Sequence, residues 1–194
     1  QYSTKNNPFR AIVEDGLGAF WLADSRGNVV KFNYDLKKTA QISISQSRVY
    51  GIINDIEKKS LYCTTSKGEL YEVNSLHQKK LLGTLQDRSP LYALYQDRQQ
   101  NLWIESEHFG IVKFDGRRFQ TGLFPRKDYT FWPFAENAII FEDINKRLWV
   151  NLKKHGLAFY DAGQEKMVDL SLNTQELNRT LSKVIQEVYY DPNG

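Results

Sequence analysis

Short hydrophobic stretches alternate with polar turns along this chain, and the stretches recur in a fixed order. Four times a stretch ends in Asp, an aromatic residue follows about six residues later, and a Gly lies six or seven residues beyond it. The four sets are Asp15, Trp21 and Gly27; Asp55, Tyr62 and Gly68; Asp97, Trp103 and Gly110; and Asp143, Trp149 and Gly156. Successive Asp positions lie 40 to 46 residues apart, and a repeat of that period indicates stacked units of common design.

One period has room for four strands. In the third copy, apolar and aromatic residues fill 91–96, 102–104, 111–114 and 118–123, and polar or Gly-containing turns separate them. Four strands in a repeat of roughly 40–45 residues are typical of a propeller blade. We therefore predict an all-β fold, a β-propeller segment of about four four-stranded blades plus the first strand of a fifth, within an array of seven or eight blades. A helical pattern occurs only over Asn173–Leu181, between two repeats.

The expected organisation is a single propeller segment over residues 1–194. Its repeats cover approximately 8–45, 46–86, 87–124 and 134–172, and residues 183–194 open a further blade. Because neighbouring blades normally cover each other's faces, an open arc of such blades exposes an apolar face at each end, which favours a homodimer. A compact ring of four blades is the alternative arrangement.

Each repeated position has a structural role in this interpretation. The Asp residues end the first strand and order the next turn, because an Asp side chain accepts hydrogen bonds from the backbone that follows it. The aromatic residues lie in the middle of the second strand and bury their rings between neighbouring blades. The Gly residues occupy the turn before the third strand, where a left-handed backbone costs Gly little. None of these roles is catalytic.

The same positions resemble the two-component regulator propeller repeat, in which a strand ending in Asp precedes Leu-Trp or Phe-Trp and then a Gly-containing turn. The matching segments are Ile12–Asp15 with Phe20–Leu22, Leu94–Asp97 with Leu102–Ile104, and Ile140–Asp143 with Leu148–Val150. The third strands end in Phe32-Asn33, Val73-Asn74, Phe114-Asp115 and Tyr160-Asp161, which completes the pattern. The resemblance covers nearly the whole chain. The second copy departs most, with Tyr62 in place of Trp and Cys63-Thr64-Thr65 after it.

The resemblance implies a location and a role. In that family the repeats form large propellers outside the cytoplasmic membrane of bacteria, ahead of an immunoglobulin-like domain, a membrane helix and a histidine kinase. The resemblance therefore implies a periplasmic sensory segment of a hybrid two-component protein, one that responds to oligosaccharides derived from polysaccharides. Its other partners would be the remaining blades and the downstream domains of the same protein, and only that longer protein would meet the membrane.

Composition and charge argue against other classes of protein. The 26 basic and 23 acidic residues leave a net charge of +3, and the basic residues are spread as pairs such as Lys37-Lys38 and Arg117-Arg118. A nucleic-acid surface needs such charges on one face, so we expect no nucleic-acid partner through this segment. The chain has no apolar run of about 18 residues that could form a membrane-spanning helix. Cys63 is the sole cysteine, which excludes an internal disulfide.

Propellers bind ligands at one end of the central channel, through the loops that lead into the innermost strands. Residues 125–137 form the longest such loop and are rich in aromatic residues where the blade pattern requires none. Aromatic rings stack on the apolar C–H faces of sugars, and neighbouring polar side chains take hydrogen bonds from the hydroxyl groups. The candidate ligand-binding residues are Arg126, Asp128, Tyr129, Trp132, Glu136 and Asn137, followed by Arg48, Tyr50 and Tyr92. In the alternative, the aromatic residues plug the channel or continue the fourth strand of the third blade.

The sequence shows no pattern of catalytic residues. It has no Gly-x-Ser-x-Gly elbow and no Gly-rich loop that could hold a phosphate. His77, His108 and His155 lack the spacing of metal ligands, so we predict no metal site, no cofactor and no catalytic residue. A carbohydrate-active propeller enzyme stays open as an alternative, because acids from several blades can combine in such enzymes. A passive scaffold for protein–protein contacts is the other alternative.

Overall fold

The structure, a computed structural model, describes residues 9–123, 140–152, 156–161, 164 and 166–169. The first sheet contains β1 (Phe9–Glu14), β2 (Ala19–Asp24), β3 (Asn28–Asn33) and β4 (Lys38–Ser43). The second contains β5 (Val49–Asp55), β6 (Ser60–Thr65), β7 (Glu69–Val73) and β8 (Lys79–Thr84). The third contains β9 (Leu91–Gln96), β10 (Leu102–Ser106), β11 (Gly110–Phe114) and β12 (Phe119–Gln120). The fourth contains β13 (Ile140–Glu142), β14 (Leu148–Leu152), β15 (Gly156–Asp161) and β16 (Lys166–Asp169).

Within each sheet the strands are antiparallel and lie in the order in which they follow along the chain. Over the described residues the structure contains strands and turns but no helix. The predicted all-β fold of four-stranded units is therefore confirmed. The described elements accordingly offer no helix that could cross a membrane. Three predicted features lie outside the described residues: the helical pattern over 173–181, the loop over 125–137 and the opening strand over 183–194.

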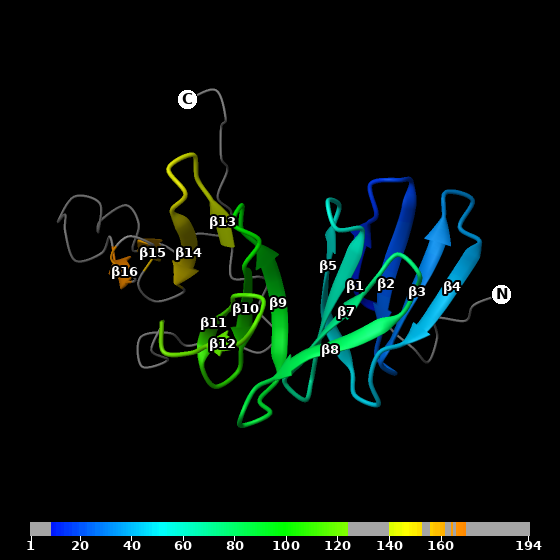
Figure 1. Cartoon of the computed structure of the whole chain (residues 1–194), viewed down its shortest axis with the longest axis horizontal. Helices are drawn as coiled ribbons and strands as arrows, with labels where there is room; N and C mark the ends of the chain where they lie inside the picture. The colour runs from blue at the N-terminus through cyan, green and yellow to red at the C-terminus, as the bar shows by residue number, and fades with distance from the viewer. Residues whose placement is uncertain (1–8, 124–139, 153–155, 162–163, 165, 170–194) are drawn as a thin grey trace.

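The four sheets are arranged in space as a fan (Figure 1). β1 contacts β5, and β5 contacts β9, so the first strands of the first three sheets come together. In Figure 1 the first sheet, in blue, and the fourth sheet, in yellow to orange, lie at opposite ends of the described structure. The first strands therefore bring equivalent positions of successive repeats close to one another.

Three apolar clusters hold adjacent sheets together. The cluster between the first and second sheets contains Trp21, Ala23, Val29, Leu61 and Cys63. The cluster between the second and third contains Tyr62, Leu70, Leu91, Ile104 and Phe114. The cluster between the third and fourth contains Trp103, Ile111, Val150, Ala158 and Tyr160. Because every cluster combines residues from two sheets, the hydrophobic effect stabilises the contacts between blades.

The repeated aromatic residues face the sheet that follows. Trp21, Tyr62 and Trp103 belong to the first, second and third clusters in that order, and all three are buried. Trp149 is half-buried and packs on Phe159 of its own sheet, with ring centroids 5.3 Å apart. Each of the first three sheets thus directs the face that carries its large ring toward the next sheet.

The first sheet exposes a large apolar side chain, Ile12, on the face that points away from the second sheet. Ile12 lies three residues before the repeated Asp, at the position that Ile52 and Leu94 take in the next two repeats. Ile52 and Leu94 pack in the first and second clusters, whereas the side chain of Ile12 is 66% exposed. Ile12 therefore belongs to the kind of apolar end face that an open stack of blades is expected to expose.

The fourth strand of the third sheet is shorter than the sequence predicts. The hydrophobic pattern indicates a strand over 118–123, but β12 contains only Phe119 and Gln120. Beyond Gln120 the chain leaves the ladder, and Leu123 packs against the cluster between the third and fourth sheets. An apolar residue near the end of a predicted strand can therefore pack between two sheets instead of extending the strand. The hydrophobic pattern of the sequence does not distinguish these two roles.

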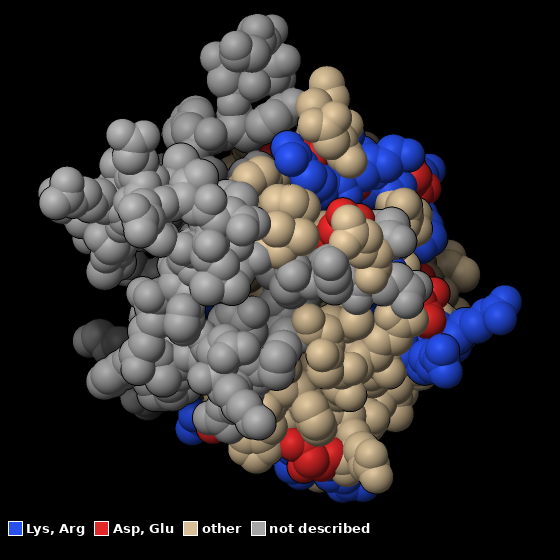
Figure 2. All heavy atoms as spheres, turned by 90° about the vertical axis from the view of Figure 1, so that its left-hand side faces the viewer, with Lys and Arg blue, Asp and Glu red and all other residues tan. Residues whose placement is uncertain are grey.

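Basic and acidic side chains lie beside one another on the face of the molecule that Figure 2 shows. Several are paired within one repeat, for example Lys31 with Asp15 at 2.8 Å and Arg147 with Asp143 at 2.7 Å. The mixed surface is the arrangement that the scattered basic pairs of the sequence predict.

Candidate functional site

A β-bulge interrupts the start of the first strand in each of the first three sheets. The register with the second strand shifts at Arg10 in β1, at Tyr50 in β5 and over Tyr92-Ala93 in β9. Arg10, Tyr50 and Tyr92 each lie five residues before the repeated Asp, so they are equivalent positions. A bulge changes the direction of a side chain, and bulges are common next to functional sites. The repeat thereby places three large side chains at the same end of three neighbouring strands.

Two of these side chains stack on each other. The ring centroids of Tyr50 and Tyr92 lie 5.0 Å apart, and the ring planes differ by 30°. Both side chains are only partly buried, so the pair joins the second and third sheets while leaving ring surface open to solvent. This pair is the centre of the candidate functional site.

The buried hydroxyl of Thr64 fixes the distance between the two strands that carry the pair. Thr64 Oγ1 donates to the carbonyl oxygen of Tyr92 at 2.6 Å and accepts the N–H of Gly51 at 3.0 Å. Gly51 allows this close approach, because a Cβ at that position would overlap the carbonyl oxygen of Tyr92. The stacked rings therefore stand on a backbone whose separation is set by one threonine and one glycine.

Glu107 adds a carboxylate beside the stacked rings. It lies in the turn between β10 and β11, and its N–H donates to the carbonyl oxygen of Pro90 at 3.0 Å. The Tyr92 hydroxyl donates to Glu107 Oε2 at 3.2 Å. Burial and the neighbouring Glu107 carboxylate raise the pKa of Tyr92 well above its ordinary value. Tyr92 therefore stays protonated and remains a hydrogen-bond donor across the physiological pH range.

The structure describes three of the nine predicted ligand-binding residues. It brings Tyr50 and Tyr92 into contact, and it places Arg48 with an exposed side chain in the segment that leads into β5. The other six lie outside the described residues: Arg126, Asp128, Tyr129, Trp132, Glu136 and Asn137. Arg10 and Glu107 were missed by the sequence reasoning. The constant spacing from the repeated Asp could have indicated Arg10, but no sequence signal indicated the contact between Glu107 and Tyr92.

A histidine–carboxylate pair lies at the same end of the third sheet. His108 Nδ1 is 2.7 Å from Asp87 Oδ2, and it joins the β10–β11 turn to the segment before β9. Burial would raise the pKa of Asp87, but hydrogen bonds from the Ser89 backbone and from His108 outweigh it and lower the pKa. The His108 side chain is 53% exposed, so its ring is accessible to solvent. It is the described side-chain pair that most resembles an acid–base group.

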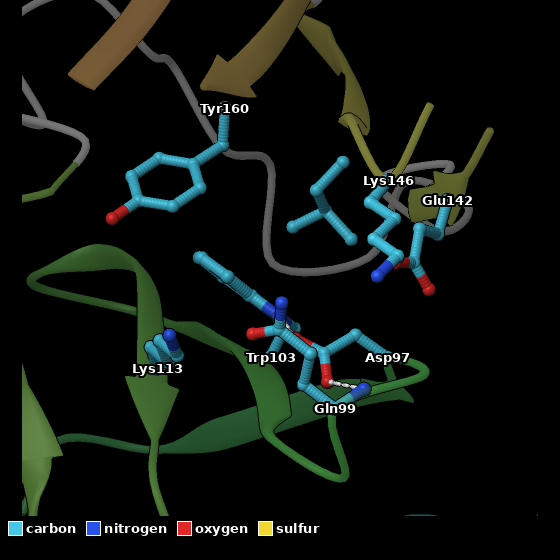
Figure 3. Close-up of a pocket in the computed structure, with 8 residues that line it drawn as sticks. Asp97, Gln99, Trp103, Lys113, Glu142, Lys146 and Tyr160 are labelled. Carbon is cyan, nitrogen blue, oxygen red and sulfur yellow. Dashed lines mark hydrogen bonds between the residues drawn. The ribbon is translucent and has the colours of Figure 1, made fainter. Parts of the chain in front are cut away.

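A small pocket lies between the third and fourth sheets, beside the repeated Asp of the third repeat (Figure 3). Its volume is about 20 Å³, which is enough for about one water molecule. Asp97, Gln99, Trp103 and Lys113 line it from the third sheet, and Glu142, Lys146 and Tyr160 line it from the fourth (Figure 3). The Glu142 carboxylate already accepts the N–H of Arg98 at 2.8 Å. This pocket is a polar seam between two blades and is too small for a ligand.

Metal-ligand geometry is absent from the described part of the chain. Among those residues, no group of three or more His, Cys, Asp or Glu side chains could hold a metal ion. Cys63 is fully buried, and burial raises the pKa of its thiol, so the reactive thiolate form is disfavoured. The stacked tyrosines with Glu107 therefore form the best-defined candidate site of the described structure.

Comparisons with known proteins bear on the fold. No model of a protein family matches the chain, and no curated protein matches it either. The extracellular domain of BT3049, named as a candidate hybrid two-component system of B. thetaiotaomicron, is 20% identical, with a TM-score of 0.58 over 82% of this chain. The extracellular domain of BT4673 from the same organism, named as a candidate one-component system, is 17% identical, with a TM-score of 0.58 over 86% of this chain.

A lyase has a similar fold. Inactive H270A virginiamycin B lyase from Staphylococcus aureus, solved with quinupristin, is 13% identical, with a TM-score of 0.65 over 90% of this chain. This chain spans 22% and 24% of the two extracellular domains and 59% of the lyase. At these identities the likeness shows the fold alone, which is that of a β-propeller.

Proposed function

We propose that this chain is part of the extracytoplasmic, ligand-sensing propeller of a bacterial hybrid two-component protein. In this proposal it binds oligosaccharides derived from polysaccharides in the periplasm, and the signal passes to a cytoplasmic histidine kinase of the same protein. The observation that carries the proposal is the stacked pair of Tyr50 and Tyr92 beside the carboxylate of Glu107.

The chemistry of the pair suits a sugar. Aromatic rings offer flat apolar surface to the C–H faces of a pyranose, and carboxylates and phenol groups exchange hydrogen bonds with its hydroxyls. Glu107 provides an acceptor, the Tyr92 hydroxyl provides a polar group at the ring edge, and exposed Arg48 provides a donor. The other predicted ligand-binding residues, within 126–137, lie outside the described residues.

The similar structures support the sensory class. Two of them are extracellular domains of bacterial signalling systems, as their names state. The sequence resemblance to the two-component regulator propeller repeat indicates the same class independently of the coordinates. These two observations together favour a sensor over a scaffold without a ligand.

The position of the pair suggests how binding could be relayed. Tyr50 belongs to the second sheet and Tyr92 to the third, so a ligand on both rings bridges two blades. A ligand shifts a conformational equilibrium only as far as it binds one arrangement better than the other. A ligand that contacts both rings favours arrangements in which the two blades stay close, and this preference is the signal in our proposal.

Calorimetric titration with a panel of oligosaccharides tests the proposal. We expect Tyr50→Ala and Tyr92→Ala each to weaken the binding of the active oligosaccharide by about tenfold, the effect of losing one aromatic contact. Tyr34→Ala is the matched control, because Tyr34 follows β3, away from the stacked pair, and is 70% exposed. Equal loss in all three variants, or binding of a second copy of the chain and of no glycan, would contradict the proposal.

A carbohydrate-active or lyase-type enzyme is the second candidate function. The pair of His108 and Asp87 is the observation that favours it, because a histidine held by a carboxylate can act as general base. The inactive lyase with a similar fold carries a substitution of a histidine, as its name states. Turnover of an oligosaccharide that His108→Ala abolishes would establish the enzyme, whereas saturable binding without turnover would favour the sensor.

A further inference from the structure

A groove of about 350 Å³ opens between the second and third sheets. The end of β8 and the two residues after it form one side, and the strands β11 and β12 with their connecting turn form the other. Its volume is near the lower limit of pockets that bind small molecules. Of the predicted ligand-binding residues that the structure describes, neither Arg48 nor the pair of Tyr50 and Tyr92 lines it.

Two irregularities of the outer strands create the groove. A bulge at Leu82 shifts the register between β7 and β8, and Gly83 follows it. A Cβ on Gly83 would lie 3.1 Å from a ring atom of Phe119, so the missing side chain lets this ring pack against β8. In addition β12 pairs with only Lys113 and Phe114 of β11, whereas β4 pairs with residues 28–32 of β3 and β8 pairs with all of β7. The outer edge of the third sheet is consequently shorter at the groove.

The floor of the groove is aromatic. Phe109, Phe114 and Phe119 line it, and the rings of Phe114 and Phe119 have centroids 5.1 Å apart. Thr84 and Gln86 contribute polar groups from the side of the second sheet. The combination of flat apolar surface with a few polar groups is typical of a site that binds the ring of a small molecule.

The charge of the lining is positive. Arg117 and Arg118, in the turn between β11 and β12, line the groove, and no described Asp or Glu side chain does. The Asp115 carboxylate accepts the backbone N–H groups of both arginines and lies 4.0 Å from Arg118 Nε. Over the described residues Arg117 has no ion-pair partner, and the Arg118 side chain is 80% exposed. Both guanidinium groups can therefore turn toward an anion in the groove.

We propose that this groove binds a small organic anion with a flat, apolar ring system. The carboxylate, sulfonate or sulfate group contacts Arg117 and Arg118, because guanidinium groups match the geometry of such anions. The ring system lies on Phe109, Phe114 and Phe119. The groove does not share Tyr50, Tyr92 or Glu107 with the oligosaccharide site of the proposed function, so each proposal can fail without the other.

Titration of the chain with 2-naphthoate, and with the neutral 2-naphthalenemethanol, tests this proposal. We expect 2-naphthoate to bind, and the neutral compound to bind at least about tenfold more weakly, because it lacks the charge that forms the strong hydrogen bonds. The double variant R117A/R118A should weaken naphthoate binding by a similar factor. Because both side chains belong to an exposed turn, this variant is expected to keep the fold, which circular dichroism checks.

The control is the double variant K37A/K38A. Lys37 lies in the corresponding turn of the first sheet, between β3 and β4, and Lys38 is the first residue of β4. Their loss changes the net charge equally. We expect naphthoate binding to stay unchanged in this variant. Equal weakening in both double variants, equal affinity for the neutral compound, or no binding of naphthoate overturns the proposal. The chemical shifts of the backbone amides during the naphthoate titration locate the binding site independently. Changes at Thr84 and Phe119 support the groove as the site, and changes confined to Tyr50 and Tyr92 overturn the proposal.

Discussion

The indole N–H of Trp103 donates to Asp97 Oδ2 over 2.8 Å, and Trp149 donates to Asp143 Oδ2 over the same distance. In the third repeat the other carboxylate oxygen, Oδ1, accepts the backbone N–H groups of Gln99 and Asn101. A single side chain therefore orders the turn after the first strand and fixes the ring of the second strand. This double role explains the spacing of six residues between Asp and Trp in the third and fourth repeats.

We expect Asp97→Ala to lower the free energy of unfolding by about 2–3 kcal/mol, because it leaves the buried indole N–H and two turn N–H groups without acceptors. Urea denaturation measures the change. Asp35→Ala is the matched control, because Asp35 is exposed in the turn between β3 and β4, and a change within about 0.5 kcal/mol is expected there. Asp97→Ala should still lower the free energy of unfolding when it is made in the Trp103→Phe variant, because the turn N–H groups still lose their acceptor. If it has no effect in that variant, Asp97 does not stabilise the turn, and the double role is wrong.

Stability should fall at low pH through the repeated Asp residues. Burial would raise the pKa of Asp143, but hydrogen bonds from Trp149 and Arg147 outweigh it and lower the pKa below its ordinary value. The pKa of Asp15 is lowered in the same way by Lys31 and the N–H groups of Ala19 and Leu17 against the effect of burial. A lowered folded-state pKa contributes stability above the unfolded-state pKa of about 3.9, and this contribution is lost as the pH falls through the folded-state value.

The measurement is the urea midpoint at several pH values between about 5 and 2. We expect the midpoint to fall over this range, and Asp143→Asn to show a smaller fall because the variant lacks one of the titrating groups. A variant whose midpoint falls as steeply as that of the unchanged chain would show that Asp143 is not linked to acid unfolding.

Gly68→Ala should destabilise the fold for two separable reasons. Gly68 has a φ of +70°, and a Cβ there would lie 2.7 Å from the carbonyl oxygen of Ser89. Gly116 has a φ of +88°, and a Cβ there would meet no described atom within 4 Å, so Gly116→Ala changes only the backbone preference. We expect a cost of about 1 kcal/mol for Gly116→Ala and a clearly larger one for Gly68→Ala by thermal or urea unfolding. Equal costs would mean that the contact with Ser89 is unimportant.

Thr64→Val tests the support beneath the stacked tyrosines. It removes the donor to the Tyr92 carbonyl and the acceptor of the Gly51 N–H, both buried, and should cost about 1–3 kcal/mol of unfolding free energy. Thr39→Val is the control, because the Thr39 hydroxyl is exposed and makes only a 3.4 Å contact with the Lys31 carbonyl. If the proposed function is right, Thr64→Val also weakens oligosaccharide binding, whereas Thr39→Val leaves it unchanged.

The fold was largely predictable because each local pattern repeats. One Asp, one ring and one Gly per unit would be ambiguous alone, but four sets in register indicate stacked four-stranded sheets. What the pattern could not supply is contact between repeats that depends on three-dimensional packing. Two examples are the hydrogen bond from the Trp103 indole to Asp97 and the close approach of Gly68 to the Ser89 carbonyl. The first depends on how a turn folds back, and the second on how two segments pack together.

The candidate site was predictable only in part. Loop position indicated Tyr50 and Tyr92, but not that a bulge in each strand would turn the two rings onto each other. The hydrogen bond from Tyr92 to Glu107 links two segments of the same sheet and leaves no periodic signal in the sequence. The groove beside Phe119 was equally hidden, because it depends on a bulge at Leu82 and on the early end of β12.

The uniform orientation of the rings gives the stack of sheets a direction. Each sheet has one face that presents a large ring and an opposite face that receives the ring of the preceding sheet. Trp21, Tyr62 and Trp103 each pack against the succeeding sheet, and Ile52 and Leu94 belong to the faces that receive a ring. A gene could therefore gain or lose one complete unit by unequal recombination without creating a mismatched junction. A recombination breakpoint within a unit would separate the face that presents the ring from the face that receives one. We therefore expect tolerated rearrangements to preserve whole units.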